Sequence, residues 1–218
     1  MVKITWHLHS FFEILSGKGT RILIDPHDGG SLNLERPEPG KPIHAILVTH
    51  NHFDHNATGL YASRDTRIFK SKTGEFTIND IVVRGVKVPH DEAGGRRRGH
   101  VVAYRIMIDG ISISHLGDIG TEKLEKQVLD ELKADVLMIP VGGVFTIGPA
   151  AAIDLVERLS PRMVIPMHFW VRGLTLPLEP LDTFLNLSRY RRLRVSGRTI
   201  EFSSEDLPDK TTILVFEL

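Results

Sequence analysis

The sequence contains no cysteine, and only one glutamine and five asparagines occur among its 218 residues. Without cysteine, neither a disulfide framework nor a cysteine-ligated zinc site can form. The chain is nevertheless well supplied with other metal-binding side chains, since it has 11 His and 27 Asp plus Glu. Any metal site must therefore be built from imidazole nitrogens and carboxylate oxygens.

An excess of charge is also missing, because 27 Lys plus Arg balance 27 Asp plus Glu. A nucleic-acid partner, which favours a basic surface, is therefore not expected. No apolar run approaches the roughly 18 residues of a membrane span, and the N-terminus lacks a signal-peptide pattern. We expect a cytoplasmic protein without a membrane partner, built as a single domain over residues 1–218. A homo-oligomer is compatible with the sequence.

The densest chemical signal lies between positions 48 and 55, where four metal-type ligands stand within six residues: His50, His52, Asp54 and His55. They follow the apolar stretch 45–48, which reads as a buried strand. Side chains alternate along an extended chain, so His50 and His52 can point the same way. Crowding such groups in a buried cleft costs free energy unless a metal binds them. A solvated polar loop is the alternative interpretation.

Further ligand-type residues follow three other predicted strands. They are His90 after residues 81–89, Asp118 after residues 111–117 and His168 after residues 163–167. Strand ends that meet at one edge of a sheet would bring these side chains to the same place.

Strands outnumber helices in the overall pattern, which predicts an α/β (α+β) fold of two sheets packed face to face with helices outside, a four-layer αββα sandwich. Expected strands cover residues 2–14, 21–25, 44–49, 67–70, 76–78, 81–88, 101–108, 111–115, 136–140, 163–167, 199–203 and 211–217. Expected helices cover residues 56–61, 121–133, 149–159 and 180–190. Asp109-Gly110 predicts a tight hairpin, and residues 29–42 predict a loop.

The order of these motifs resembles the metallo-β-lactamase superfamily of metal-dependent hydrolases. The matching elements are Asp25-Pro26, the Thr-His-x-His-x-Asp-His run at 49–55, the lone His90, Gly117-Asp118 and Pro166-x-His168. Within the superfamily, residues 4–11, 115–120 and 140–149 are similar to the branch of small hydrolases around the ascorbate-6-phosphate lactonase. The resemblance covers residues 1 to about 175.

This resemblance implies a site for two divalent cations. His50, His52 and His90 would hold one cation, Asp54, His55 and His168 would hold the other, and Asp118 would bridge them. Zinc is the expected metal, and manganese, iron or nickel also suit these ligands. Two positions depart from the branch, because His100 follows Arg98-Gly99 and Thr121 follows Gly120. The resemblance therefore implies the metal site and not the substrate of the branch.

Two cations about 3.5–4 Å apart can acidify a shared water and so supply a bridging hydroxide as the nucleophile. Asp25 is expected to accept a hydrogen bond from a ligand histidine and to fix its tautomer. His9 and then His115 are the candidates for proton transfer, since imidazole titrates near neutrality. The alternatives are a turn-opening role for Asp25 and core or edge roles for both histidines.

Several other residues carry weaker signals. Arg96, Arg97 and Arg98 could bind a phosphate or carboxylate of an anionic substrate, although a solvated loop is the preferred interpretation. Phe145 and Thr146 could line the cleft or simply pack. The remaining histidines, His7, His27, His44 and His100, are interpreted as structural or surface residues.

Three functional classes follow. The first is a dinuclear metal-dependent hydrolase, lactonase-like, acting on a small ester, lactone or phosphoester. The second is a nuclease (phosphodiesterase) on the same fold, and the third is a metal-binding protein without catalysis. The balanced charge weakens the second, and the complete ligand set weakens the third.

Overall fold

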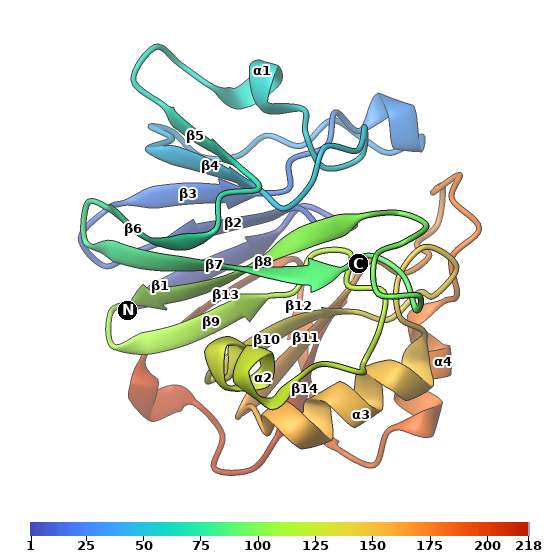
Figure 1. Ribbon diagram of the computed structural model, residues 1–218. Helices are drawn as coiled ribbons and strands as arrows, with labels where there is room; N and C mark the ends of the chain where they lie inside the picture. The colour runs from blue at the N-terminus through green and yellow to red at the C-terminus, as the bar shows by residue number, and fades with distance from the viewer. Residues whose placement is uncertain (218) are drawn as a thin grey trace.

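The computed structural model describes residues 1–217, which form two mixed β-sheets packed face to face (Figure 1). In spatial order, the six-stranded sheet contains β13 (Thr199–Phe202), β1 (Val2–Trp6), β2 (Phe12–Leu15), β3 (Arg21–Ile24), β4 (Ala45–Val48) and β5 (Arg67–Lys70). The eight-stranded sheet contains β12 (Arg191–Ser196), β14 (Thr212–Glu217), β11 (Met163–Met167), β10 (Val136–Pro140), β9 (Ile111–His115), β8 (His100–Ile108), β7 (Ile81–Pro89) and β6 (Gly74–Ile78).

The helices cover the two sheets unequally. In Figure 1, α2 (Lys126–Leu132), α3 (Pro149–Leu159) and α4 (Leu181–Leu187) lie together beneath the eight-stranded sheet. Among the described residues, the opposite side carries only the short α1 (Thr58–Tyr61) and the 3₁₀ turn η1 (Gly30–Leu32). A second such turn, η2 (Ser204–Asp206), precedes β14. The predicted fold class is confirmed. None of the helices in residues 1–217 is long and apolar enough to cross a membrane.

The core lies between the sheets and beneath the helices. Every residue of β9, β10 and β11 is buried, as expected for parallel strands covered on both faces. A second, smaller apolar cluster contains residues of β3, β4 and α1 and includes Phe11, Ile46 and Tyr61. Burial of these side chains supplies the main driving force for folding.

The topology brings the ends of five strands to one edge of the sandwich. β3 and β4 run parallel, and so do β9, β10 and β11. β7 runs antiparallel to β8, which itself runs antiparallel to β9, so β7 and β9 point the same way. Within each sheet these strand ends therefore lie at the same edge, and the residues that follow them meet where the two sheets pack together. These positions carry the predicted metal ligands and Asp25.

One predicted strand is wrong. Residues 2–14 do not form a single strand, because the chain reverses between β1 and β2, which pair antiparallel with Trp6 opposite Phe12. The turn contains Leu8 and His9 with φ of 72° and 52°. Residues other than glycine seldom adopt this left-handed backbone conformation, so the residue types at 8 and 9 did not indicate a turn. The reversal places His9 at the edge where the ligands meet.

The helix predicted at 121–133 is too long at its N-terminal end, because α2 begins at Lys126. Arg158 donates hydrogen bonds to the carbonyl oxygens of Glu122 and Leu124. A first helical turn would have used those acceptors, so tertiary contacts replaced it. The helix predicted at 180–190 likewise stops at Leu187. After it comes the strand β12, which the prediction missed because its residues, apart from the half-buried Val195, are exposed and arginine-rich.

Other predictions are confirmed. The helix at 149–159 has the expected bounds, with Gly148 as N-cap and Pro149 in the first turn. Asp109 and Gly110 have φ of 48° and 78°, the pair of positive values that a type I′ hairpin turn requires. This hairpin joins β8 to β9 and sets the register of the strand that leads to Asp118.

Candidate metal centre

The predicted ligands converge at the common strand edge. The ligand-type atoms form three groups, and the atoms of each group all lie within 4.8 Å of one another. The groups are His9, Asp54, His55 and His168; His50, His52 and His90; and Asp25, His50 and His55. All of these side chains are buried except His52, which faces solvent. Because the groups share members, they form one continuous cluster.

Asp118 lies between the first two groups. Its Oδ2 atom is 3.7 Å from Nε2 of His50 and 3.4 Å from Nε2 of His168, and its Oδ1 atom is 3.3 Å from Nε2 of His55. The carboxylate is almost completely buried. A single side chain therefore faces ligand atoms of both groups, which is the position that a bridging ligand requires.

Several buried polar atoms in this cluster have no hydrogen-bond partner. They include Nε2 of His55, Nδ1 of His90, both ring nitrogens of His168 and Oδ1 of Asp118. Burying such atoms unpaired is costly, and native structures contain few of them. These nitrogens and oxygens are the donors that a divalent transition metal accepts. The residues present therefore fit a metal centre.

Asp25 sets the orientation of two ligand histidines. Its carboxylate accepts hydrogen bonds from the backbone N–H of Thr49 at 2.7 Å, from the Thr49 hydroxyl at 2.6 Å and from Nδ1 of His55 at 2.9 Å. With its proton given to Asp25, the Thr49 hydroxyl accepts from Nδ1 of His50 at 3.0 Å. Both histidines thus carry a proton on Nδ1, which leaves Nε2 as the nitrogen of each ring that faces the cluster and that a cation would use.

The electrostatics of the cluster suit a cation. Burial alone would raise the pKa of Asp118, but the neighbouring His168 and His55 outweigh it and hold that pKa well below its usual value. Burial would lower the pKa of His55, yet three surrounding carboxylates, led by Asp118, raise it well above its usual value. Negative charge is thus concentrated where the ligand atoms meet. Burial lowers the pKa of His50 to about 3, which keeps this ligand neutral.

The two proton-transfer candidates occupy different surroundings. Nε2 of His9 lies 3.0 Å from Oδ2 of Asp54, to which it donates, while its Nδ1 is buried without a partner. In contrast, His115 donates from Nε2 to the carbonyl oxygen of Ser10 and accepts at Nδ1 from the backbone N–H of Gly117. Both nitrogens of His115 are occupied by backbone. The structure therefore favours a structural role for His115, contrary to the expected proton transfer.

The ligands open onto a cleft of about 580 Å³. It is lined by His52, Phe53, Asp54, His90, Arg97, Arg98, Asp118, Phe145 and Leu176. Asp54 of the first group and His52 and His90 of the second line this cleft, so a molecule bound in it lies against the candidate metal centre. Its volume suits a small organic molecule.

The loop from Asp91 to Gly99 forms one wall of the cleft, and Asp91 is a residue that the sequence analysis missed. Its buried carboxylate accepts hydrogen bonds from the backbone N–H groups of Ala93, Gly95, Arg97 and Arg98, at 2.7–3.0 Å. Burial would raise the pKa of Asp91, but these bonds, first that of Arg98, lower it to about 2. The sequence shows only that Asp91 stands three residues before Gly94-Gly95, which does not identify the N–H groups that its carboxylate binds. Thr49 was also missed as a functional residue.

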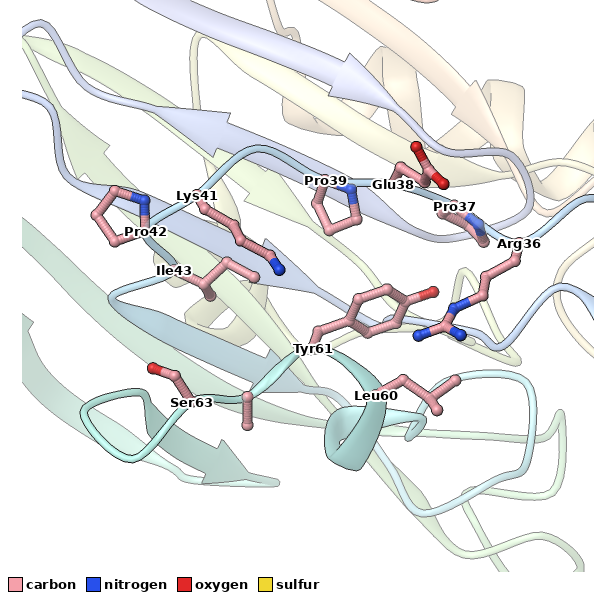
Figure 2. Close-up of a pocket in the computed structure, with 11 residues that line it drawn as sticks. Arg36, Pro37, Glu38, Pro39, Lys41, Pro42, Ile43, Leu60, Tyr61 and Ser63 are labelled. Atoms are coloured by element: carbon pink, nitrogen blue, oxygen red, sulfur yellow. The ribbon is translucent and has the colours of Figure 1, made fainter.

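A larger cavity of about 970 Å³ lies elsewhere, between residues 36–43 and residues 60–63 (Figure 2). Figure 2 shows Tyr61 and Lys41 facing the same space from these two segments. None of the predicted metal ligands lines this cavity. Its size alone therefore does not make it the reactive site.

The remaining histidines lie outside the ligand groups. His27 donates to the carbonyl oxygen of His7, His7 contacts Glu13, and Nδ1 of His44 accepts from the backbone N–H of Arg21. His100 is exposed at the start of β8. These contacts match the expected structural and surface roles. Thr121, where the sequence departs from the lactonase branch, is buried and caps the backbone N–H of Lys123.

Comparisons with known proteins agree with this geometry. Residues 3–168 match the beta-lactamase superfamily domain. A UPF0173 metal-dependent hydrolase from Thermococcus onnurineus is 34% identical over 194 residues, covering 78% of this chain and 85% of the relative. Another from Symbiobacterium thermophilum is 35% identical over 191 residues, covering 74% and 81%.

Solved structures show the same fold. The crystal structure of a candidate zinc-dependent hydrolase of the metallo-β-lactamase superfamily from Thermotoga maritima has a TM-score of 0.78 and 28% identity, with complete coverage of both chains. A metallo hydrolase from Ignicoccus hospitalis has a TM-score of 0.68 at 20% identity, covering 93% of this chain and 99% of the other. None of these relatives is an ascorbate-6-phosphate lactonase, so that narrower resemblance stays a prediction. The chain belongs to the metallo-β-lactamase superfamily and, within it, to the UPF0173 family of metal-dependent hydrolases.

Proposed function

We propose that this metal-dependent hydrolase holds two divalent cations and cleaves a small ester, lactone or phosphoester. His50, His52 and His90 would hold one cation, Asp54, His55 and His168 the other, and Asp118 both. The observation that carries the proposal is the position of the buried Asp118 carboxylate between the two groups of ligand atoms. When bound, such cations acidify water to supply a nucleophile near neutral pH and stabilise negative charge that develops on the substrate.

The chain's own residues prepare the site for this chemistry. Asp25 and Thr49 keep the Nδ1 protons of His55 and His50 in place, so that each ring presents its other nitrogen. His9 orients Asp54 through its Nε2 proton. His9 also remains the candidate for proton transfer to a leaving group, because His115 has no uncommitted nitrogen.

The proposed substrate class follows from the cleft. A volume of about 580 Å³ accommodates a small molecule, and its lining combines the apolar Phe53, Phe145 and Leu176 with the ligand residues. Zinc is the first metal to test, because the Thermotoga maritima relative is described as zinc-dependent and the ligands are of the type zinc uses. Manganese, iron and nickel come next.

The test measures hydrolysis by the purified protein before chelation, after chelation, and after each metal is restored. The substrate panel contains 4-nitrophenyl acetate, γ-butyrolactone and bis(4-nitrophenyl) phosphate. We expect turnover of at least one compound, loss of that turnover on chelation, and about two bound metals per chain. Turnover that survives complete metal removal would contradict the proposal. Cleavage of RNA with none of the small substrates turned over would instead support the nuclease alternative.

A further inference from the structure

The loop of residues 91–99 has a fixed backbone although much of its surface is exposed. The carboxylate of Asp91 binds four backbone N–H groups along the loop. The loop is also closed at its base, where the His90 N–H donates to the Gly99 carbonyl oxygen at 3.0 Å, and the Gly99 N–H donates to that of Gly95 at 3.0 Å. The position of the main chain at residues 97 and 98 is therefore set from inside the loop.

Glycine at position 95 is required for this shape. Its φ is 83°, and a Cβ atom there would lie 2.6 Å from the carbonyl oxygen of Gly99, closer than real Cβ contacts allow. A loop held in this way does not behave as a freely solvated segment. The arginines are exposed, as the preferred interpretation from sequence expects, but the backbone of the loop is fixed and Arg97 and Arg98 line the cleft.

The two cleft arginines are engaged differently. The side chain of Arg97 pairs with the carboxylate of Glu92 at 2.5 Å. The guanidinium of Arg98 lies over the ring of Phe145, 5.1 Å from its centroid, and within residues 1–217 it has no carboxylate within salt-bridge distance. Among the described residues, Arg98 thus has no ion-pair partner at the cleft wall. Stacking on an aromatic ring leaves the edge of the guanidinium, with its N–H donors, open to an acceptor.

Arg98 faces the same cleft as the metal centre. Asp54 and Asp118 are the acidic groups that line it, and both are proposed metal ligands. The basic groups are Arg97 and Arg98 together with the ligands His52 and His90. One molecule can therefore touch the ligand edge and the Arg98 guanidinium at once.

We propose that Arg98 binds a carboxylate or phosphate on the substrate, so that the hydrolase acts on small anionic molecules that carry this group away from the bond that is cleaved. A planar guanidinium matches either oxyanion with two parallel hydrogen bonds. Phe145 supports the guanidinium from one face, and Asp91 is a positioning residue that fixes the loop. This proposal rests on the proposed hydrolase function for the position of the cleaved bond.

The test uses three 4-nitrophenyl esters of similar length: the neutral pentanoate, the glutarate monoester with a terminal carboxylate, and the 4-phosphonobutanoate with a terminal phosphonate. In Arg98→Met the side chain keeps its length and can still contact Phe145, but it loses the charge. We expect KM for at least one anionic ester to rise about 10–100-fold, since a hydrogen bond to a charged group contributes about 1.5–3 kcal/mol. KM for the pentanoate ester and the metal content should stay unchanged.

Arg96→Met is the matched control, because Arg96 belongs to the same loop and does not line the cleft. It should leave all three KM values as in the wild type. Asp91→Asn should raise KM for the anionic ester while kcat and bound metal stay constant, and Arg98→Lys should recover only part of the binding because the planar fork is lost. Whichever anionic ester is affected identifies the group that Arg98 binds.

Calorimetric titration with glutarate and with 4-phosphonobutanoate separates this proposal from the proposed function. Suppose that the wild type hydrolyses no ester, but that one of these anions binds more weakly to Arg98→Met than to Arg96→Met. In that case the anion site stands and the hydrolase proposal fails. If the esters are hydrolysed and Arg98→Met changes neither their KM values nor anion binding, the anion site is refuted and the hydrolase proposal stands.

Discussion

The metal centre and the cleft wall formed by residues 91–99 are built on opposite plans. At the candidate metal centre, the ends of backbone strands hold the proposed metal ligands, which are buried except for His52. In the cleft wall, the buried side chain of Asp91 holds the backbone of the loop, while the side chains of Arg97 and Arg98 line the cleft. Under the two proposals, reaction type depends on the strand ends, whereas substrate choice depends on a loop that can change separately.

The sharpest test of the first plan is Asp118→Ala. Because Asp118 faces both ligand groups, its loss should reduce bound metal and lower kcat by at least about 1,000-fold. Metal analysis and kinetics on the same preparation measure both effects. Asp130→Ala, which removes an exposed carboxylate on α2, is the control and should leave both unchanged. Wild-type turnover in Asp118→Ala would remove this residue from the mechanism.

A second comparison separates ligands from their neighbours. His9→Ala should retain most bound metal and lower kcat by about 10²–10⁴-fold if His9 transfers a proton. His52→Ala should lose metal as well as rate, because a coordinating nitrogen is removed. The substrate must have a poor leaving group, such as ethyl butanoate, since a good one departs without a proton. Loss of metal in His9→Ala would identify His9 as a ligand, and full activity would leave it a structural role.

Asp25→Asn tests the support behind the ligands. An amide in place of the carboxylate cannot accept all three hydrogen bonds, so His55 and Thr49 lose their fixed orientation. We expect metal affinity or activity to fall about 10–100-fold. Competition with a chromophoric chelator measures the affinity. An unchanged affinity together with an unchanged rate would show that the histidines are oriented without Asp25.

The smallest expected effect concerns stability at low pH. Burial lowers the pKa of His27 to about 4, and its ring nitrogens are hydrogen bonded to backbone. In the unfolded chain the pKa is near 6.5, so between these values the unfolded state binds more protons, and stability falls as pH drops from about 6.5 to about 4. The loss reaches at most about 3 kcal/mol.

In His27→Asn, the Asn carbonyl oxygen can take over the hydrogen bond from Gly29 without titrating. Urea unfolding at several pH values should then show a shallower decline in stability than in the wild type over the same window. Parallel declines in the two proteins would show that His27 does not contribute to the acid sensitivity.

The convergence of the predicted metal ligands could be inferred from sequence because these residues follow apolar strands. His50 to His55 stand directly after β4, and His90, Asp118 and His168 each follow another strand. Strand pairing then forces these positions to one edge. The pattern of buried strands is written in the residue types, so both the fold and the convergence of ligands could be inferred. The helix at 149–159 was predictable for the same reason.

The errors have a different physical origin. Leu8 and His9 turn the chain in a conformation that their residue types disfavour, so residues 2–14 read as one strand. The carboxylate of Asp91 binds backbone N–H groups. Every residue type except proline supplies such a group, so the residue types do not reveal these hydrogen bonds. Arg98 and Phe145 are far apart in sequence and meet only through the fold. Specific tertiary contacts of this kind leave no local periodicity.

The anchoring of residues 91–99 also bears on how this enzyme could acquire new substrates. Asp91 binds only main-chain N–H groups of the loop, so the identities of the side chains at 96, 97 and 98 do not enter those bonds. These three positions can therefore be exchanged, except for proline at 97 and 98, while the loop keeps the bonds that fix its shape. A library randomised at positions 96–98 would therefore vary the side chains that the cleft wall presents to a substrate without changing any of the proposed metal ligands.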